Sequence, residues 1–142
     1  SINLPAIASL IRKHKPSLVI LDQMQLFSSG ERSSNLVEEL GKLYYRIKNM
    51  CTKFGVAAFV THQANQGAAD EYRSPSMKDV YMGDALYQAC DLAMSMCRVK
   101  GDDGVPLPMR RIYFQAVRNR KLPVSWVTLD WDEDSGTISE QQ

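Results

Sequence analysis

Apolar residues recur at helical spacing in two stretches within the first half of the chain. The first stretch opens at Asn3 and Pro5 and stops at Lys15-Pro16, because proline is tolerated in a first helical turn but ends a helix that runs into it. The second stretch, residues 36–54, is more regular, and Gly55 after it can close a helix in the left-handed conformation. The pattern therefore predicts two amphipathic helices.

Unbroken apolar runs follow both helices, at Leu18–Leu21 and at Val56–Thr61. Such runs are typical of strands that are buried on both faces, as parallel strands are. A short helical segment, Asp84–Cys90, then leads to a third strand at Leu92–Arg98. The alternation of helix and strand predicts a parallel α/β sheet, in which ligands bind at the carboxyl ends of the strands.

Two polar stretches lack any period and are predicted as loops: Ser28–Ser34 and Gln66–Met82, of which the second is expected to be mobile. The last part of the chain alternates like a two-stranded ribbon, with strands at Arg111–Arg118 and Val124–Trp131 around a tip at residues 119–123. The expected fold class is therefore α/β: a parallel sheet with flanking helices, finished by a C-terminal antiparallel β-hairpin.

The size and composition are those of one compact globular domain, since 44% of the 142 residues are hydrophobic and 23% are charged. No apolar run approaches the roughly 20 residues needed to cross a bilayer, and no signal-peptide pattern is present. Cys51, Cys90 and Cys97 lack metal-site spacing and are odd in number, which indicates reduced thiols and a cytoplasmic protein. A start at Ser1 rather than at Met indicates a piece of a longer protein.

The net charge of +1 hides a segregation along the chain. Residues 98–121 hold seven basic and two acidic groups, whereas residues 122–142 hold five acidic groups and no basic one. A locally basic stretch predicts contact with a polyanion. A solvated hairpin of mixed charge is the alternative interpretation.

Two polar residues follow the first two predicted strands at the edge where ligands bind. Asp22 comes directly after Leu18–Leu21, and a carboxylate there can hold a magnesium ion through its water shell. Gln63 follows the second strand, and its amide can both donate to a phosphate and accept from a water. The alternatives are a capping aspartate and an ordinary polar residue where a strand enters a loop.

Arg118 and Arg120 are two positions apart in a strand-like segment, so their side chains are predicted to leave the same face. Paired guanidiniums near a hairpin tip suit bidentate contacts to a phosphate. At a subunit boundary they can act as fingers on the γ-phosphate of the neighbour's nucleotide. An exposed basic turn or a nonspecific contact to a DNA backbone is the alternative interpretation.

Taken in order, these segments resemble the C-terminal ATPase domain of DnaB-type hexameric replicative DNA helicases, which is a RecA-like P-loop NTPase fold. The likeness runs over about residues 4–140 and depends on the order and spacing of its motifs. Four motifs carry it: LVILDQMQL (18–26) is similar to the Walker B motif, AAFVTHQAN (57–65) to the glutamine motif, EYRSPSMKDVYMGDALYQACDLAMSM (71–96) to the stretch with a DNA-contacting loop, and AVRNRKLPVSWVTLDWD (116–132) to the K-x-R hairpin.

The resemblance implies a site for ATP and Mg²⁺ between adjacent subunits of a ring, expected to be a hexamer. One subunit would supply Asp22, as the magnesium-linked carboxylate, and Gln63. The neighbour would supply Arg118 and Arg120, with Arg120 in the arginine-finger position.

The resemblance also implies that ATP hydrolysis drives movement along single-stranded DNA and unwinding of the duplex during DNA replication. The loops at residues 28–34 and 66–82 would face the strand, with Arg73 and Lys78 as phosphate contacts. The alternative is that these loops are simple connections.

Several departures from the family pattern are visible. The glycine-rich phosphate loop, G-x-x-x-x-G-K-[ST], does not occur in the 142 residues and is expected to precede Ser1, together with a catalytic glutamate. Arg118 stands where lysine is usual, His62 where serine is frequent, and Leu122 where glycine is common. The departures indicate a divergent member, for which a virus is an expected source. The isolated chain is not expected to hydrolyse ATP.

Two rival interpretations stay open. A RecA-like recombinase or KaiC-like ATPase can also carry Thr-x-Gln at this strand end, as Thr61–Gln63 does. A non-catalytic α/β binding or assembly module is the other, and there Asp22 and the two arginines would be structural.

Overall fold

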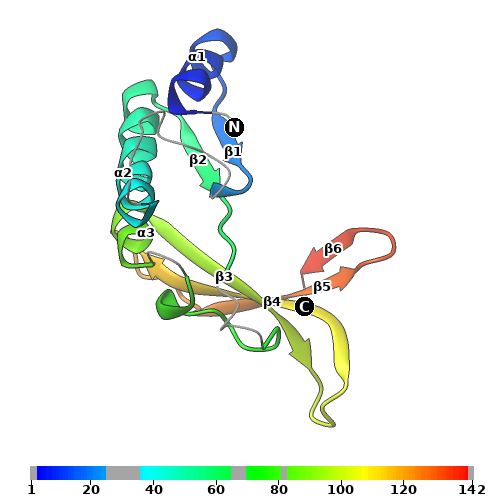
Figure 1. Ribbon diagram of the computed structural model, residues 1–142. Coiled ribbons are helices and arrows are strands. Elements are labelled where there is room, and N and C mark those ends of the chain that lie inside the picture. The colour runs from blue at the N-terminus through cyan, green and yellow to red at the C-terminus, as the bar shows by residue number, and fades with distance from the viewer. Residues whose placement is uncertain (1–2, 25–35, 65–69, 81–82, 141–142) are drawn as a thin grey trace. The chain divides into compact units, whose positions relative to one another are not determined.

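The computed structural model describes residues 3–24, 36–64, 70–80 and 83–140 (Figure 1). The predicted loop at Ser28–Ser34 lies outside the described residues, as do the two ends of the predicted loop at Gln66–Met82. The chain divides into two compact units, the first formed by residues 1–63 with 84–89 and the second by residues 64–83 with 90–142.

The first unit holds a two-stranded parallel sheet. Strand β1 (Leu18–Leu21) pairs with strand β2 (Ala57–Val60), with Leu18 opposite Ala57 and Leu21 opposite Val60. The two apolar runs therefore form neighbouring parallel strands, as predicted, and their carboxyl ends lie at the same edge of the sheet.

The helices of the first unit are α1 (Leu4–His14), α2 (Leu36–Phe54) and the short α3 (Gly83–Ala89). The side chain of Asn3 caps α1 by accepting a hydrogen bond from the amide of Ala6 at 3.1 Å. Gly55 closes α2 with a φ of +63°, the left-handed conformation that the sequence predicts. Helix α3 is joined to α2 by a hydrogen bond of 2.9 Å from the Tyr45 hydroxyl to Gln88.

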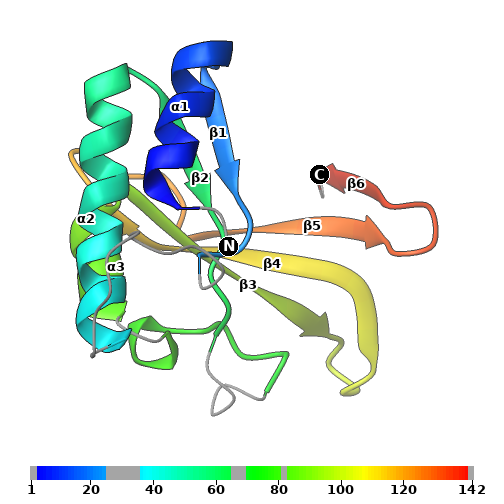
Figure 2. The same cartoon turned by 45° about the horizontal axis from the view of Figure 1, so that its top comes forward.

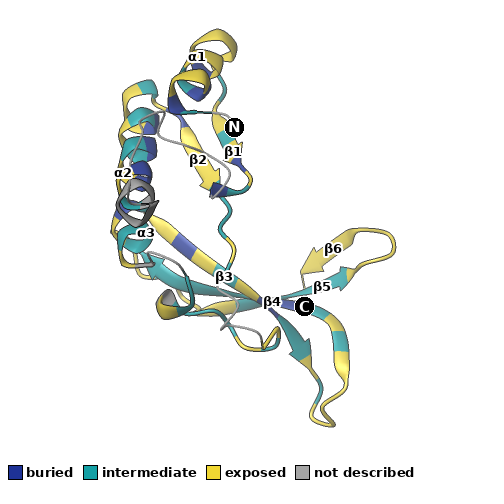
Figure 3. Cartoon of the chain, viewed as in Figure 1, coloured by how far each residue is buried: buried dark blue, intermediate teal, exposed yellow. Residues whose placement is uncertain are grey.

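The core of the first unit lies between the two long helices and one face of the sheet (Figure 3). Met24 and Leu43 are fully buried there, with 0% of their surface exposed. The other face of the sheet is open, because Leu18, Ile20 and Phe59 are all exposed. The prediction that these strands are buried on both faces is therefore wrong, since Leu21 is the one buried residue of β1 and β2.

Truncating Leu43 is expected to destabilise this core. Leu43→Ala should lower the free energy of unfolding by about 2–5 kcal/mol, because it removes buried methyl groups and leaves a cavity. Urea denaturation followed by circular dichroism measures the change. Asn49→Ala on the exposed side of the same helix is the control, and it should alter the free energy by less than about 0.5 kcal/mol. Equal effects of the two substitutions would contradict the burial of Leu43.

The second unit is built on a four-stranded antiparallel sheet in the order β3-β4-β5-β6 (Figure 2). Its strands are β3 (Leu92–Lys100), β4 (Pro106–Val117), β5 (Trp126–Asp132) and β6 (Thr137–Glu140). The α/β class is confirmed, with a parallel and an antiparallel sheet. The third predicted strand differs from expectation, since β3 pairs antiparallel with β4 and not with the parallel strands.

The connection between β3 and β4 explains this pairing. A tight turn at residues 101–105 reverses the chain, with Gly104 at a φ of +80° and a hydrogen bond of 2.8 Å from the Gly101 amide to the Val105 carbonyl. Strands joined by such a short connection can pair only antiparallel.

No helix in the described part of the chain is long and apolar enough to cross a membrane.

Candidate functional site

Asp22 and Gln63 lie at the same edge of the parallel sheet, just beyond the ends of β1 and β2. The Thr61 hydroxyl donates a short hydrogen bond to the Asp22 carboxylate. Backbone bonds hold the two strand ends together, from the Thr61 amide to the Leu21 carbonyl at 3.1 Å and from the Met24 amide to the Thr61 carbonyl at 3.0 Å. The sequence predicted Asp22 and Gln63 at this edge, and the parallel register places them there.

Asp22 and Gln63 are both exposed, whereas His62 between the two strand ends is half-buried. Burial lowers the pKa of His62, and the Gln63 carbonyl, 2.8 Å from its Nδ1, raises it to a smaller extent. The ring of Tyr44 lies 6.2 Å away between centroids, and burial raises the pKa of its hydroxyl to about 12. The edge therefore presents one exposed carboxylate, one exposed amide and a hydroxyl against an uncharged background.

A solitary carboxylate with a neighbouring hydroxyl is a suitable donor set for a magnesium ion that keeps most of its water ligands. Within the described ranges, no three His, Cys, Asp or Glu side chains are grouped in a way that could enclose a metal ion. Asp22 with Thr61 therefore fits a Mg²⁺ ion held through its water shell, and does not fit an all-protein metal cage.

Arg118 and Arg120 lie beyond the end of β4, at the tip between β4 and β5. The amide of Arg118 donates to the Asp91 carbonyl at 2.8 Å, which fixes where the tip begins. Asn119 between them has a φ of +61°, so strand alternation stops at Val117. The rule that placed both arginines on one face therefore does not apply, although both are exposed.

The acidic end of the chain neutralises part of the basic stretch. Glu133 accepts from Arg110 in a short ion pair and from Arg98 at 3.2 Å, and Arg98 also pairs with Glu71 at 3.1 Å. Glu133 lies in the turn between β5 and β6. Strand β6 is not among the strands that the sequence predicts. Mixed charge therefore describes this part of the sheet, while the basic tip of residues 118–121 is exposed.

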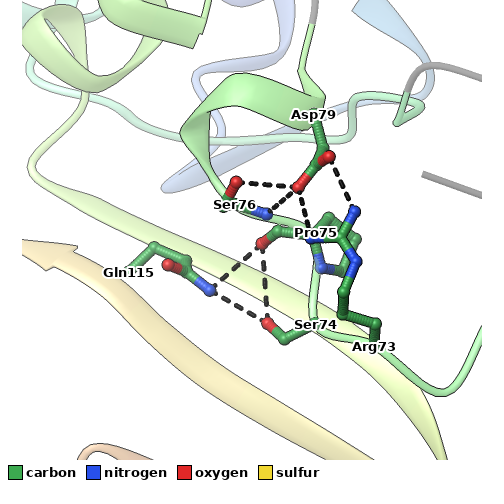
Figure 4. A network of polar contacts seen from close by, with 6 residues as sticks. All are labelled: Arg73, Ser74, Pro75, Ser76, Asp79 and Gln115. Carbon is green, nitrogen blue, oxygen red and sulfur yellow. Dashed lines mark hydrogen bonds and ion pairs between the residues drawn. The ribbon is translucent and has the colours of Figure 1, made fainter. Parts of the chain in front are cut away.

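Residues 70–80, the described part of the loop that is predicted to be mobile, are held together by an ion pair and hydrogen bonds. Arg73 makes a bidentate pair with Asp79, at 2.9 and 2.8 Å, which raises the pKa of the arginine and holds that of the aspartate well below its usual range (Figure 4). Ser76 donates to the same carboxylate from its amide and its hydroxyl, each at 2.7 Å. Lys78, in the one-turn helix η3 (Met77–Asp79), is exposed.

Sequence reasoning singled out Arg73 of the six residues in this network and missed the others, among them Asp79 and Gln115. Asp79 is indicated by the Ser-x-x-Asp spacing from Ser76, which is the pattern of a capping box. Gln115 carries no such local signal, because its partners in the loop lie 40 and 41 positions earlier in the chain.

A separate hollow of about 500 Å³ lies at the opposite edge of the first unit. Ser17 and Gly55, which precede β1 and β2, place it at the amino ends of the strands. It is lined by Ile11, Arg12, Lys15, Pro16, Ser17, Phe54 and Gly55. None of the predicted site residues lines it.

Comparison with known proteins gives a fold but no family. No protein-family profile matches the chain. The DNA repair protein RadA of Aquifex aeolicus (strain VF5) is 38% identical over 64 residues, which are 44% of this chain and 14% of RadA.

Solved structures match over almost the whole chain. A DnaB-like replicative helicase, described with its interactions with primase, superposes with a TM-score of 0.81 at 18% identity, and the match covers 99% of this chain and 36% of the helicase. A second solved structure, of an ATPase domain, gives a TM-score of 0.80 at 18% identity, with 99% of this chain and 52% of that domain covered. The chain thus spans about half, or less, of the structures it matches. It has the α/β fold of DnaB-like helicase and ATPase domains.

Proposed function

We propose that this chain is part of an ATP-dependent replicative DNA helicase that couples ATP hydrolysis to movement along single-stranded DNA. The observation that carries the proposal is the placement of Asp22 and Gln63 at the carboxyl ends of two adjacent parallel strands. Ligands of open α/β sheets bind at that edge. The superposition on DnaB-like helicase and ATPase domains supports the same interpretation of the edge.

Asp22, with Thr61 beside it, would hold a Mg²⁺ ion through its water shell. The bound ion neutralises charge on the β- and γ-phosphates of ATP. Gln63 would donate to a phosphate oxygen and accept from a water with the same amide, so that its position would follow the state of the nucleotide. His62 would add no positive charge to this edge at neutral pH, because burial lowers its pKa.

Arg118 and Arg120 would act on the nucleotide of a neighbouring subunit in a ring, expected to be a hexamer. Their exposure at the ribbon tip suits a contact outside their own subunit. Guanidinium groups supplied in trans stabilise the charge that develops on the γ-phosphate during transfer. Assembly would therefore be a condition for hydrolysis.

The loop of residues 70–80 would contact the single strand, chiefly through Lys78. Arg73 directs two guanidinium nitrogens at Asp79, so its role in DNA contact would be mainly to shape the loop. An exposed lysine on a fixed one-turn helix can reach a phosphate as a point charge.

The experiment that tests this function uses the full-length protein with a forked duplex. We expect duplex unwinding that requires ATP and Mg²⁺ and hydrolysis that single-stranded DNA stimulates. A protein that exchanges homologous strands but does not unwind the fork would instead support a RecA-like recombinase. A protein with neither activity and no nucleotide binding would support the assembly module.

Lys78→Ala is expected to weaken binding of single-stranded DNA by the full-length protein. Loss of one phosphate contact should reduce the slope of log K against log salt by about 0.7, since single strands release fewer counterions than duplexes. Fluorescence anisotropy at several salt concentrations measures both quantities. Lys53→Ala, at an exposed position in the last turn of α2, is the charge-matched control. An unchanged slope would leave Lys78 as a solvated side chain.

A further inference from the structure

Gln115 occupies a β-bulge in β4. Ala93 lies opposite Ala116 and Met94 lies opposite Phe114, so Gln115 is the extra residue without a partner on β3. A bulge releases its extra residue from the ladder and re-aims its side chain. The side chain of Gln115 is thereby free to contact the loop of residues 70–80.

The Gln115 amide fastens that loop to the sheet. Its Nε2 donates to the Ser74 hydroxyl at 3.0 Å and to the Pro75 carbonyl at 3.1 Å (Figure 4). The same nitrogen lies 2.7 Å from the Ser95 hydroxyl of β3, which is itself 2.7 Å from the Ser74 hydroxyl, and its two N–H groups are shared among these three acceptors. These groups are partly buried, so an acceptor that lost its donor would not be fully compensated by water. One side chain therefore joins β3, β4 and the loop.

The same strand leads to the ribbon tip. Gln115 is three residues before Arg118 and five before Arg120, and the intervening residues continue β4 to Val117. The first residue of the tip is held by the bond from the Arg118 amide to Asp91. A shift of the tip would therefore be passed along β4 to Gln115 over a short, hydrogen-bonded path.

The loop can transmit such a shift because it is closed on itself. The Asp79 carboxylate accepts hydrogen bonds from both Arg73 and Ser76. Ser74 and Pro75 lie between these two donors in the chain and are therefore held in place relative to η3. Lys78 lies in that one-turn helix. Movement of Gln115 against Ser74 and Pro75 would therefore move Lys78.

We propose that Gln115 is a positioning residue that couples the arginine-bearing tip to the loop that carries Lys78. The inference rests on the proposed function. It adds the contact through which the bound nucleotide would affect the binding of single-stranded DNA, and DNA binding would affect the nucleotide site. A coupling of this kind is reciprocal, so DNA on the loop would also act on the tip.

The test is Gln115→Met in the full-length protein, which keeps the length of the side chain and removes its donors. ATP hydrolysis is measured without DNA and over a range of single-stranded DNA concentrations. The rate without DNA should stay within about twofold, while the stimulation by DNA should fall by about fivefold or more, the size of a typical coupling. Hydrogen exchange should show faster exchange of amides 72–79. Unchanged stimulation and unchanged exchange would overturn the proposal.

Two further variants separate coupling from a loss of folding. Tyr113→Phe, two positions away on the same strand, removes a hydroxyl that takes no part in the network and should behave as the wild type. Ser74→Ala removes the partner on the loop side, and adding Gln115→Met to it should have little further effect. Additive losses would contradict a shared path. If the wild type itself shows no DNA-stimulated hydrolysis, the proposed function fails. If the wild type shows it and Gln115→Met shows it to the same extent, the proposed function stands and the coupling fails.

Discussion

Arg120→Ala in the full-length protein is expected to reduce the rate of ATP hydrolysis by about 10³- to 10⁵-fold, the contribution of an arginine finger in related phosphoryl-transfer sites. The reason is electrostatic, because charge on the γ-phosphate oxygens grows toward the transition state and a guanidinium placed there stabilises it. Binding of ATP should change little, since most of its contacts would come from the other subunit. Steady-state hydrolysis and binding of a fluorescent ATP analogue measure the two effects.

Lys121→Ala is the matched control for Arg120. It removes one positive charge from the same exposed tip, one position further along the chain. A loss of hydrolysis in both variants would indicate a general effect of charge at the tip, and survival of hydrolysis in Arg120→Ala would remove the finger assignment. Mixing the variant with wild-type subunits adds a second readout, because a finger acting in trans impairs the neighbour's site and not its own.

Asp22→Asn is expected to reduce Mg²⁺-dependent hydrolysis by about 10²-fold or more, since metal ions contribute several kcal/mol of transition-state stabilisation and each 1.36 kcal/mol is tenfold. The substitution keeps the size of the side chain and an oxygen that can accept from the Thr61 hydroxyl. Charge is therefore the property that changes. The Mg²⁺ concentration for half-maximal hydrolysis should rise together with the loss of rate.

The control for Asp22 is Asp102→Asn, which makes the same chemical change in an exposed turn of the second unit. It should leave both the rate and the Mg²⁺ dependence as in the wild type. Asp22→Asn with an unchanged Mg²⁺ dependence would show that Asp22 is only a capping residue at the end of β1.

Local patterns were sufficient to locate most of the helices and strands. The spacing of apolar residues gave α2 to within a residue, and the tetrad Leu18–Leu21 is β1 itself. The division of the strands between two sheets could not be predicted from local patterns, because an unbroken apolar run does not indicate which other strand it pairs with. Strand β6 was missed because Thr137–Glu140 follows an acidic turn and holds a single apolar residue, Ile138, which is too little to show an alternating pattern.

In the candidate site, too, features set by local sequence could be predicted, and features set by contacts between distant residues could not. The shared edge of Asp22 and Gln63 follows from parallel order alone, which the sequence supports. The fastening of residues 70–80 depends on side chains brought from β3 and β4, and pairings over 20 to 41 positions leave no periodic trace. The prediction that Arg118 and Arg120 leave the same face relied on strand alternation, and β4 ends before both of them, at Val117.

The backbone at Asn119 restricts how this tip can evolve. Its φ of +61° belongs to a region that glycine, asparagine and aspartate visit readily and that β-branched residues avoid. Mutations to valine or isoleucine would redirect the chain between two arginines without touching either guanidinium. The left-handed conformation costs an ordinary L-residue about 1–2 kcal/mol, so this exposed position is constrained by the handedness of the main chain and not by packing.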